Sequence, residues 1–345
     1  MTNQVALIRA SASPQVGGGH IVRCMALAHE LTAQGWVCKF VSGPETATTI
    51  PMVSEYEIIT IDESDPTREP EAIRQQYGQD VPVVIIDHYQ RGYKFETECR
   101  KWADKIVVLN DVPSDAHNAD LLLDQSGGRT PTEYSGLIPN SCELILGPGY
   151  SLLRHQFSSF GPVDFKEKLI HPRIFISMGA TDGNNLTATA MDAVNNTLPG
   201  SNVDVMLSAK APHLPEIQAK CLENALTRLH VDSADPALFM AHATFAIGTA
   251  GINLWERCAL GIPSILLIAA ENQRDNALHV VAEGGGVLIG CNNGLSINTR
   301  ELEDTIVKMW RDKVNLINMS NVAQRICDGM GAKRVADKIS TVAGF

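Results

Sequence analysis

The sequence predicts an α/β protein that consists of two doubly wound domains. Short apolar runs, which suit buried parallel strands, alternate with helical patterns, and this βαβ rhythm occurs twice along the chain. The length of 345 residues also exceeds what one hydrophobic core usually serves. We therefore expect residues 1–157 and 172–325 to form the two domains, joined by a linker at 158–171, where no period is sustained.

The expected strands are short, apolar and separated by helical patterns in both halves. They cover residues 5–9, 36–41, 57–61, 83–86, 105–109, 121–123 and 144–146 in the first half, and 173–177, 203–207, 228–231, 244–247, 264–268 and 286–289 in the second. A last helical pattern spans about 314–342, and residues 326–345 are expected to form a C-terminal helix that can return to the first domain. Because ligands bind at the carboxyl ends of parallel strands, we expect the two domains to face each other across a cleft.

Composition excludes several classes of function. The net charge of −11 argues against a nucleic-acid partner, which needs a basic face. No apolar run approaches the ~20 residues of a membrane span. The eight cysteines include no C-x-x-C pair and read as reduced residues, and the chain enters a strand by residue 5 without a secretion signal. These features favour the cytoplasm, with a monomer as the working expectation and the oligomeric state left open.

The first informative stretch lies at residues 17–24, where Gly17, Gly18 and Gly19 precede His20. An apolar strand comes before this glycine turn, and an amphipathic helix follows it until Gly35 ends the helix. Such a turn places unpaired backbone N–H groups and one histidine at the carboxyl edge of a parallel sheet. We therefore expect His20 to point into a ligand crevice.

A nicotinamide or flavin site is not expected at this turn. The dinucleotide fingerprint requires G-x-G-x-x-G, and this pattern is absent. The second strand also ends without an acidic residue, at Ser42 and Gly43. A purely structural alternative stays open, in which the glycines form a tight turn and the histidine only caps its helix.

The second informative stretch is the strand end at residues 247–251 followed by a helix that carries Glu256. Small side chains let a backbone approach a diphosphate closely, and the start of a helix favours negative charge. The carboxylate of Glu256 could accept hydrogen bonds from two ribose hydroxyls. The alternative is an acidic residue that is merely favourable near a helix start.

In combination, the motifs resemble a known enzyme family over nearly the full chain. They are G-x-G-H-x-x-R-C, D-H-Y, L-L-L-D-Q, G-P-x-Y-x-L-L-R, S-x-G-x-T-D, and W-E-R-C-x-L-G-x-P with a later N-Q. The family is that of the UDP-2,4-diacetamido-2,4,6-trideoxy-β-L-altropyranose hydrolases of bacterial pseudaminic acid biosynthesis, related to the GT-B glycosyltransferases such as the lipid II GlcNAc transferase. The resemblance implies a GT-B fold of two Rossmann-like domains and the release of UDP and free sugar for nonulosonic acid synthesis, including flagellin and surface-glycan modification.

The resemblance also implies roles for individual residues. His20 would activate water. The residues expected at UDP are Gly18, Gly19, Gly248, Thr249, Ala250, Gly251, Ile252, Glu256, Asn272 and Gln273, and those expected at the sugar are Arg9, Ser11, Asp87, His88, Tyr89 and Arg154.

Five positions depart from the family pattern. Ser11 replaces an aspartate of the first loop, Asn110 stands in the usual I-D-D, Ser126 ends the D-Q-N, Ala180 replaces a glycine of the G-G-T-D, and Ile252 lies in a run that is usually small and polar. Several of these changes cluster on loops expected at the sugar. The identity of the sugar and the group that orients His20 are therefore left open.

The expected reaction is inverting hydrolysis. A water held by His20 would attack the anomeric carbon on the face opposite UDP, because a histidine side chain can accept a proton near neutral pH. UDP leaves as a stable anion, so neither a general acid nor a metal or other cofactor is expected, and no D-x-D triplet is present. The alternatives are a GT-B glycosyltransferase with a UDP-sugar donor, a UDP-sugar 2-epimerase, and a non-catalytic nucleotide-sugar binding protein.

Overall fold

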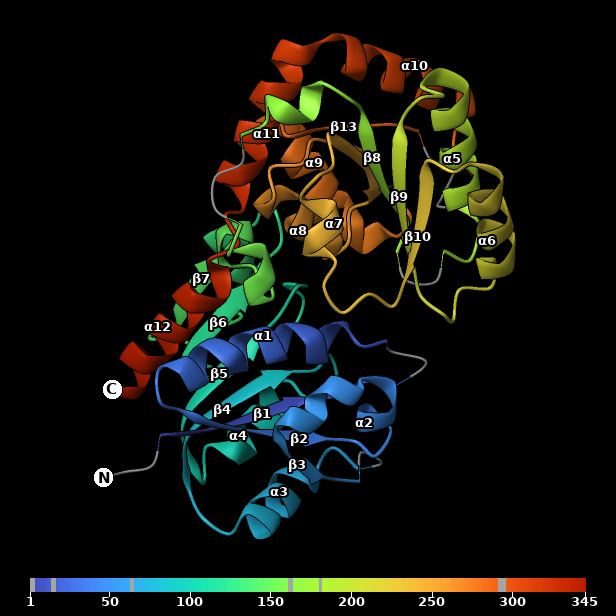
Figure 1. The fold of residues 1–345 in the computed structure, drawn as a ribbon. Helices are drawn as coiled ribbons and strands as arrows, with labels where there is room; N and C mark the ends of the chain where they lie inside the picture. Colours follow the sequence, from blue (N-terminus) through green and yellow to red (C-terminus); the bar gives the residue numbers. More distant parts are fainter. Residues whose placement is uncertain (1–3, 14–16, 63–64, 161–163, 180–181, 291–295) are drawn as a thin grey trace. The chain divides into compact units, whose positions relative to one another are not determined.

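The computed structural model describes residues 4–13, 17–62, 65–160, 164–179, 182–290 and 296–345. The chain forms two compact units (Figure 1). The first unit runs from the N-terminus to Arg154 and resumes at Met330, and the second runs from His155 to Gly329. Each unit is a doubly wound α/β domain, as predicted.

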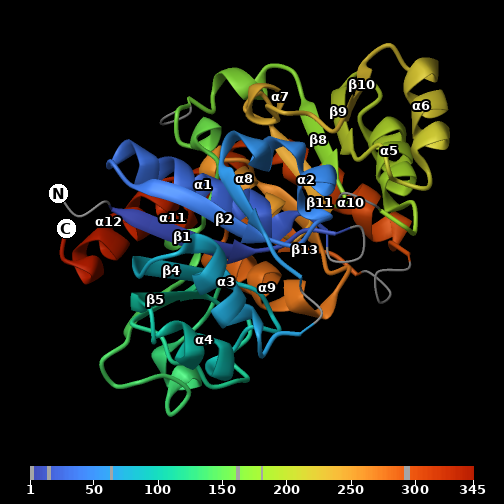
Figure 2. The same ribbon diagram turned by 90° about the horizontal axis from the view of Figure 1, so that it is seen from below.

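The described residues of the first unit form a parallel sheet of seven strands in the order β3-β2-β1-β4-β5-β6-β7. Figure 2 shows β2, β1, β4 and β5 side by side in this order. The strands are β1 (Val5–Ala10), β2 (Val37–Ser42), β3 (Glu57–Thr60), β4 (Val81–Asp87), β5 (Ala103–Leu109), β6 (Leu121–Asp124) and β7 (Glu143–Leu146). The order of the strands along the chain reverses between β1 and β4, and doubly wound proteins bind ligands at such a reversal.

Alternate side chains of these strands enter two cores on opposite faces of the sheet. On one face, Ile8 and Ile85 pack with apolar residues of α1 (Gly19–Ala33) and α12 (Gly331–Ala343). On the other face, Leu7 and Val84 pack with residues of α3 (Glu69–Tyr77) and α4 (Tyr93–Cys99). This alternation is typical of a sheet that helices cover on both faces.

The last helical pattern of the sequence, which spans about 314–342, is interrupted close to residue 326, where we expected the C-terminal helix to begin. Helix α11 (Lys313–Ile326) ends in the second unit, and α12 begins again at Gly331 in the first. Between them Gly329 adopts φ +79°, a left-handed conformation that a helix cannot contain. Helix α12 then lies beside α1 (Figure 1), and the indole of Trp36 donates to Ser340 Oγ at 3.0 Å.

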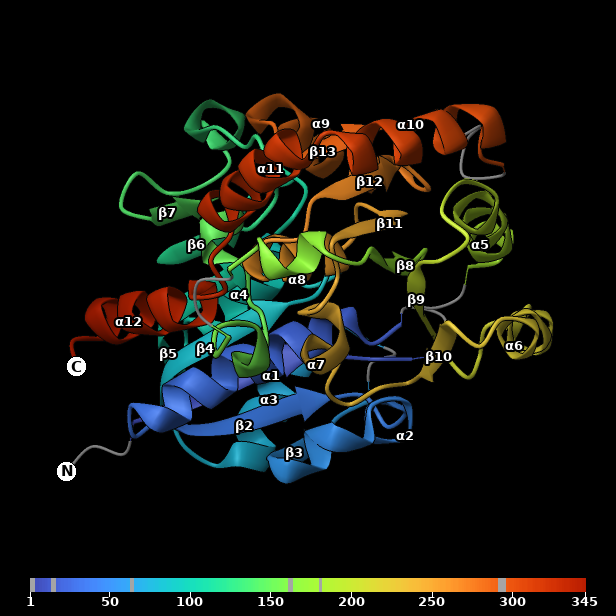
Figure 3. The same cartoon turned by 45° about the horizontal axis from the view of Figure 1, so that its top comes forward.

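The described residues of the second unit form a parallel sheet of six strands in the order β10-β9-β8-β11-β12-β13, which Figure 3 shows in sequence. Here the chain order reverses between β8 and β11. The strands are β8 (Arg173–Ser177), β9 (Asn202–Leu207), β10 (Thr227–Val231), β11 (Phe245–Thr249), β12 (Ser264–Leu267) and β13 (Gly286–Leu288). Every predicted strand is therefore confirmed, with ends that differ by at most two residues.

Among the described residues, one face of the second sheet packs against α5 (Leu186–Thr197), α6 (Leu214–Glu223), α10 (Thr299–Arg311) and α11. Phe165, inside the stretch expected to be a linker, is buried in the same core. The described part of residues 158–171 thus packs as part of the second unit, while 161–163 lie outside the described residues. The remaining helices of the described chain are α2 (Thr46–Thr49), α7 (Ala237–Met240), α8 (Asn253–Ala259) and α9 (Arg274–Glu283), and its 3-10 helices are η1 (Pro51–Glu55), η2 (Pro131–Tyr134), η3 (Pro148–Tyr150), η4 (His155–Phe157), η5 (Glu167–Leu169) and η6 (Glu271–Gln273).

Two further properties follow from the described part of the chain. None of its helices combines the length and the apolar composition that crossing a bilayer requires. Its cysteines form no disulfide bonds with one another, and most of them are buried; Cys291 lies outside the described residues.

Candidate functional site

His20 and Asp87 meet at the reversal point of the first sheet. His20 lies in the first turn of α1, directly after β1, and Asp87 is the last residue of β4, the strand that pairs with β1. Because both strands are parallel, their following residues emerge at the same edge. The fold thereby unites two residues that are 67 positions apart.

The imidazole of His20 is held by this carboxylate. Its Nδ1 lies 2.6 Å from Asp87 Oδ1, and the side chain is 13% exposed. An ionised carboxylate can only accept a hydrogen bond, so the pairing fixes the proton on Nδ1. Nε2 is then the nitrogen with a free lone pair, and none of the described residues hydrogen-bonds to it. This is the arrangement that general-base histidines use.

Asp87 is itself fixed by a buried arginine. Arg23 Nε and Nη2 donate to the two Asp87 oxygens at 2.7 and 2.6 Å, and Arg23 Nη1 donates to Asp111 at 2.7 Å. Burial alone would raise the pKa of Asp87, but the Arg23 guanidinium and the hydrogen bonds from Arg23 and His20 hold that pKa well below its ordinary value. The carboxylate therefore stays ionised under His20 at all ordinary pH values.

These contacts correct the expected role of Asp87. We predicted that it contacts the sugar, but the residue is 1% exposed and both its oxygens are occupied, one by His20 and Arg23 and the other by Arg23 and Cys24. Asp87 orients His20 instead. It supplies the partner that the sequence left open.

Arg9 is likewise buried where we expected a sugar contact. It is 1% exposed and forms an ion pair with Glu69, which also binds Arg91. Nη1 of Arg9 donates to Ser11 Oγ at 2.6 Å, and Ser11 accepts a second bond from the backbone N–H of Gly43. Arg9 therefore supports the first loop from below. Its buried side chain offers no surface to a sugar.

Next to His20 there is a cavity of about 240 Å³. Ser11, His20, His88 and Tyr89, all predicted site residues, line it. The Tyr89 ring meets the His20 ring edge-on, with 4.9 Å between the ring centroids, and Tyr89 is 67% exposed. An exposed aromatic ring beside a base is a surface on which a sugar can stack. The remaining lining residues are Ala12, Ser13, Asp87, Gln90 and Arg91.

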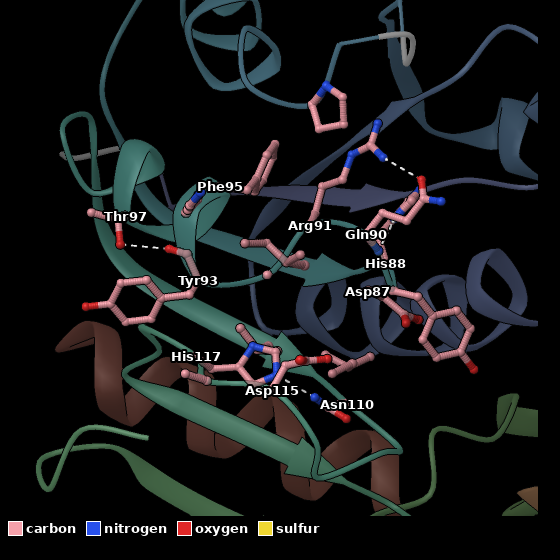
Figure 4. Close-up of a pocket in the computed structure, with 18 of the residues that line it drawn as sticks. Asp87, His88, Gln90, Arg91, Tyr93, Phe95, Thr97, Asn110, Asp115 and His117 are labelled. Carbon is pink, nitrogen blue, oxygen red and sulfur yellow. Dashed lines mark hydrogen bonds between the residues drawn. The ribbon is translucent and has the colours of Figure 1, made fainter. Parts of the chain in front are cut away.

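A larger cavity of about 920 Å³ shares the segment 87–91 with the smaller one. In Figure 4, Tyr93 and Phe95 of α4 border one side of it and His117 the other. His117 hydrogen-bonds Asn110 through Nε2 and Glu96 through Nδ1. Ile86, Val108 and Leu109 give this cavity an apolar floor.

Of the sequence departures in the turns after β5 and β6, one lines this cavity; Ala180 lies outside the described residues. Asn110 lines it and accepts a hydrogen bond from the backbone N–H of Val112 at 2.6 Å, so it shapes the turn after β5. Ser126 is 9% exposed, and its backbone N–H donates to Asp124 at 2.8 Å. Asn110 thus reaches a surface that a ligand can touch, whereas Ser126 serves the turn after β6.

The glycines of the first loop differ in what they do. Gly17 has φ +80° and closes a small bridge to Ser13, which a side chain would strain. A methyl group on Gly18 would collide with the side chain of Ile50. At Gly19 the same methyl would meet open space. Of the two glycines expected at UDP, Gly19 is exposed with open space beside it, whereas Gly18 is needed for packing against Ile50.

In the second unit, the loop after β11 has a buried part and an accessible part. Gly248, Thr249 and Ala250 are buried, Gly251 is partly exposed and Ile252 is 43% exposed. A side chain at Gly248 would strike the Ser177 carbonyl and the Arg257 guanidinium. This glycine therefore serves internal packing. Because residues 248–250 are buried, we expect a ligand to reach this segment only at the backbone groups near Gly251.

A set of amide side chains surrounds this loop. Gln273 accepts from the backbone N–H of Ala269 at 3.1 Å, and its Nε2 lies 3.8 Å from where a Gly251 side chain would begin. Asn276 donates to the Ala250 carbonyl at 3.4 Å. Strands β11 and β12 are neighbours, so their following loops share one edge of the sheet.

The predicted ribose residue Glu256 lies one turn into α8. It is 9% exposed and accepts a hydrogen bond from Asn253 Nδ2 at 2.6 Å. The predicted Asn272 is exposed in η6. Arg154, predicted at the sugar, is partly buried at the end of the first segment of unit 1 and does not line either cavity among the described residues.

Sequence reasoning missed several residues that complete these sites. They are Arg23 and Asp111 under His20, Glu69 and Arg91 under the first loop, and Asn276 and Arg257 at the second. Arg23 alone carried a usable signal. It follows His20 by three positions, which puts both residues on one face of α1.

The two parallel, doubly wound units define a GT-B fold. Solved structures agree along nearly the whole chain. MurG of Acinetobacter baumannii superposes with a TM-score of 0.68 at 14% identity, covering 98% of this chain and 99% of that one. The glycotransferase of kitacinnamycin superposes with a TM-score of 0.69 at 15% identity, covering 99% and 100%. At such identities the likeness establishes the fold alone.

A sequence relative gives a more particular likeness. The chain is 24% identical over 285 residues to the UDP-2,4-diacetamido-2,4,6-trideoxy-β-L-altropyranose hydrolase of Campylobacter jejuni, covering 81% of this chain and 96% of the relative. No protein-family model matches the chain.

Proposed function

We propose that this protein is an enzyme that hydrolyses a UDP-linked amino sugar, a diacetamido-trideoxy-hexose or a close relative. The observation that carries the proposal is the His20–Asp87 pair, which presents an imidazole with an open Nε2 at a cavity on the ligand-binding edge of the first sheet. The similarity to the Campylobacter hydrolase supports the same reaction. The GT-B fold supports a nucleotide-sugar substrate.

In the proposed reaction, Nε2 of His20 takes a proton from a water molecule as the water oxygen attacks the anomeric carbon. The bond between that carbon and the UDP oxygen breaks, and its electron pair leaves with UDP. Attack from the face opposite UDP inverts the configuration. Asp87 and Arg23 keep the imidazole in the tautomer that can accept this proton.

Different residues are assigned to the two parts of the substrate. Residues of the first unit, with Ser11, His88 and Tyr89 around the cavity, would hold the sugar. Residues of the second, with the loop before Glu256 and the side chains of Asn272 and Gln273, would hold UDP. The buried positions Arg9 and Asp87 are left out of the sugar contacts.

The test is incubation of the purified protein with a panel of UDP-acetamido and UDP-diacetamido sugars in ¹⁸O-labelled water, without an acceptor. We expect UDP release, the label in the sugar, and an inverted product anomer by proton NMR. Label in the phosphate would mean cleavage of the P–O bond and would contradict the mechanism. No UDP release from any member would leave hydrolysis of these sugars unsupported.

A glycosyltransferase is the second candidate, and the larger cavity favours it. Its volume of about 920 Å³ and its apolar lining exceed what a free water nucleophile needs and could receive an acceptor molecule. UDP release that depends on an added alcohol would support this alternative. Release in water alone would support hydrolysis.

A further inference from the structure

Arg257 is a buried cation that lacks the partners of the other buried arginines. It lies in α8 and is 0% exposed, and its Nη2 donates to the carbonyl of Thr249 at 2.6 Å. No described residue accepts a hydrogen bond from its Nε or Nη1. Arg23 binds two carboxylates, and Arg9 and Arg91 share Glu69, whereas Arg257 forms no ion pair with a described residue.

The surrounding structure holds this guanidinium directly against the loop that follows β11. A methyl group placed on Gly248 would come within 2.5 Å of Arg257 Nη1. The absence of a side chain at Gly248 is therefore what leaves room for the cation. Through Thr249 the guanidinium is bonded to the same short segment whose accessible end is Gly251.

Such an arrangement is unfavourable in the ligand-free protein. A buried charge without a carboxylate partner loses its hydration and regains little in return. Burial lowers the pKa of Arg257 to about 10, with Glu256 and Cys258 nearby opposing the shift. The group nevertheless stays protonated at neutral pH. Destabilising features of this kind are retained where they serve binding or catalysis.

We propose that Arg257 provides the positive charge that stabilises the diphosphate of the bound nucleotide from beneath the β11–α8 loop. This inference rests on the proposed function of the loop as a UDP site. Arg257 acts as a positioning residue: it holds the Thr249 carbonyl and it supplies a fixed cation behind the backbone that faces the phosphates. A fixed charge in a dry environment attracts an anion more strongly than one in water.

The experiment compares the binding of UDP and of uridine by calorimetry in the wild type, Arg257→Met and Arg257→Lys. We expect Arg257→Met to weaken UDP binding about 10- to 100-fold, to leave uridine binding within about twofold, and to melt at or above the wild-type temperature without ligand. Arg257→Lys keeps a charge and should recover part of the UDP affinity.

Arg173→Met is the matched control, because Arg173 lies in the same unit but pairs with Asp204 at 3.3 Å. It should lower the melting temperature and leave the ratio of UDP to uridine affinity unchanged. Equal losses for UDP and uridine in Arg257→Met, or an unchanged UDP affinity, would overturn the inference. A wild type that binds neither compound would instead refute the proposed nucleotide site itself.

Discussion

The substitution Asp87→Asn tests the core of the proposed mechanism, because one carboxylate serves four donors. It accepts from His20 Nδ1, from two nitrogens of Arg23 and from Cys24 Sγ. An asparagine keeps only one acceptor oxygen and turns an NH₂ group toward the remaining donors. If the NH₂ faces His20, the imidazole must accept at Nδ1, and Nε2 then carries the proton and cannot act as a base.

We expect kcat for UDP release to fall about 10²- to 10⁴-fold, the range found when a base histidine loses its orienting carboxylate. The unfolding free energy should fall by about 3 kcal/mol, because a buried ion pair is broken. This loss is at the lower end of the range for broken buried ion pairs, because Arg23 keeps its 2.7 Å contact with Asp111. The assay is steady-state UDP release together with urea unfolding.

Glu96→Gln is the matched control for this experiment. Glu96 is also fully buried and holds His117 Nδ1 at 2.6 Å in the same unit. We expect a similar loss of stability with kcat within a few fold of wild type. The reasoning fails if Asp87→Asn keeps nearly full kcat, or if Glu96→Gln loses as much.

The acid sensitivity of Asp87 gives an independent check. Its pKa in the folded protein lies below the ordinary value of ~3.9, so its ionised form adds stability at every pH above that value. This stability is lost as the pH falls below about 4 toward the lowered folded pKa. Asp87→Asn should therefore show a flatter decline of unfolding free energy with acid than wild type. If the unfolding free energies of wild type and Asp87→Asn decline identically as the pH falls, Asp87 does not contribute to the acid sensitivity.

Further substitutions test the other positions. His20→Ala should lower turnover about 10³-fold with UDP affinity near wild type, and a variant with nearly full rate would remove the histidine from the mechanism. Glu256→Ala should weaken UDP binding about tenfold in calorimetry, and Asn253→Ala should weaken it less. If Glu256→Ala binds UDP as tightly as the wild type, the ribose contact is excluded. Gly248→Ala should lower the unfolding free energy by about 1–3 kcal/mol because its methyl group meets Arg257, whereas Gly19→Ala meets open space and should be tolerated.

The strands were predictable because their signal is local. A run such as that at residues 83–86 can bury both faces only in a parallel sheet, and the structure contains β4 there. The C-terminal helix was expected from residue 326 and α12 begins at Gly331; its exact start could not be predicted because the helical period continues on both sides of the break. Residues 327–330 separate the two helices; Gly329 among them is left-handed, and a glycine in a sequence does not reveal its φ angle.

The site was predictable where a motif marks it and unpredictable where distant residues pair. The glycine loop located His20. Arg9 was placed at the sugar because the family resemblance implies a contact there, and its neutralising partner Glu69 lies sixty positions away, out of reach of a local pattern. The role of Asp87 was hidden for the same reason, since its pairing with His20 depends on β1 lying beside β4.

The return of α12 to the first unit has a consequence for the biosynthesis of the chain. Ala332, Val335, Ala336 and Ile339 complete an apolar core whose other buried members belong to the first 152 residues. During translation these side chains emerge only after all of the second unit has been made, so the second unit can fold on the ribosome before the first has its full interior. Until then the nascent first unit exposes the apolar side of α1 that α12 later covers. We therefore expect the first unit to need a chaperone more than the second.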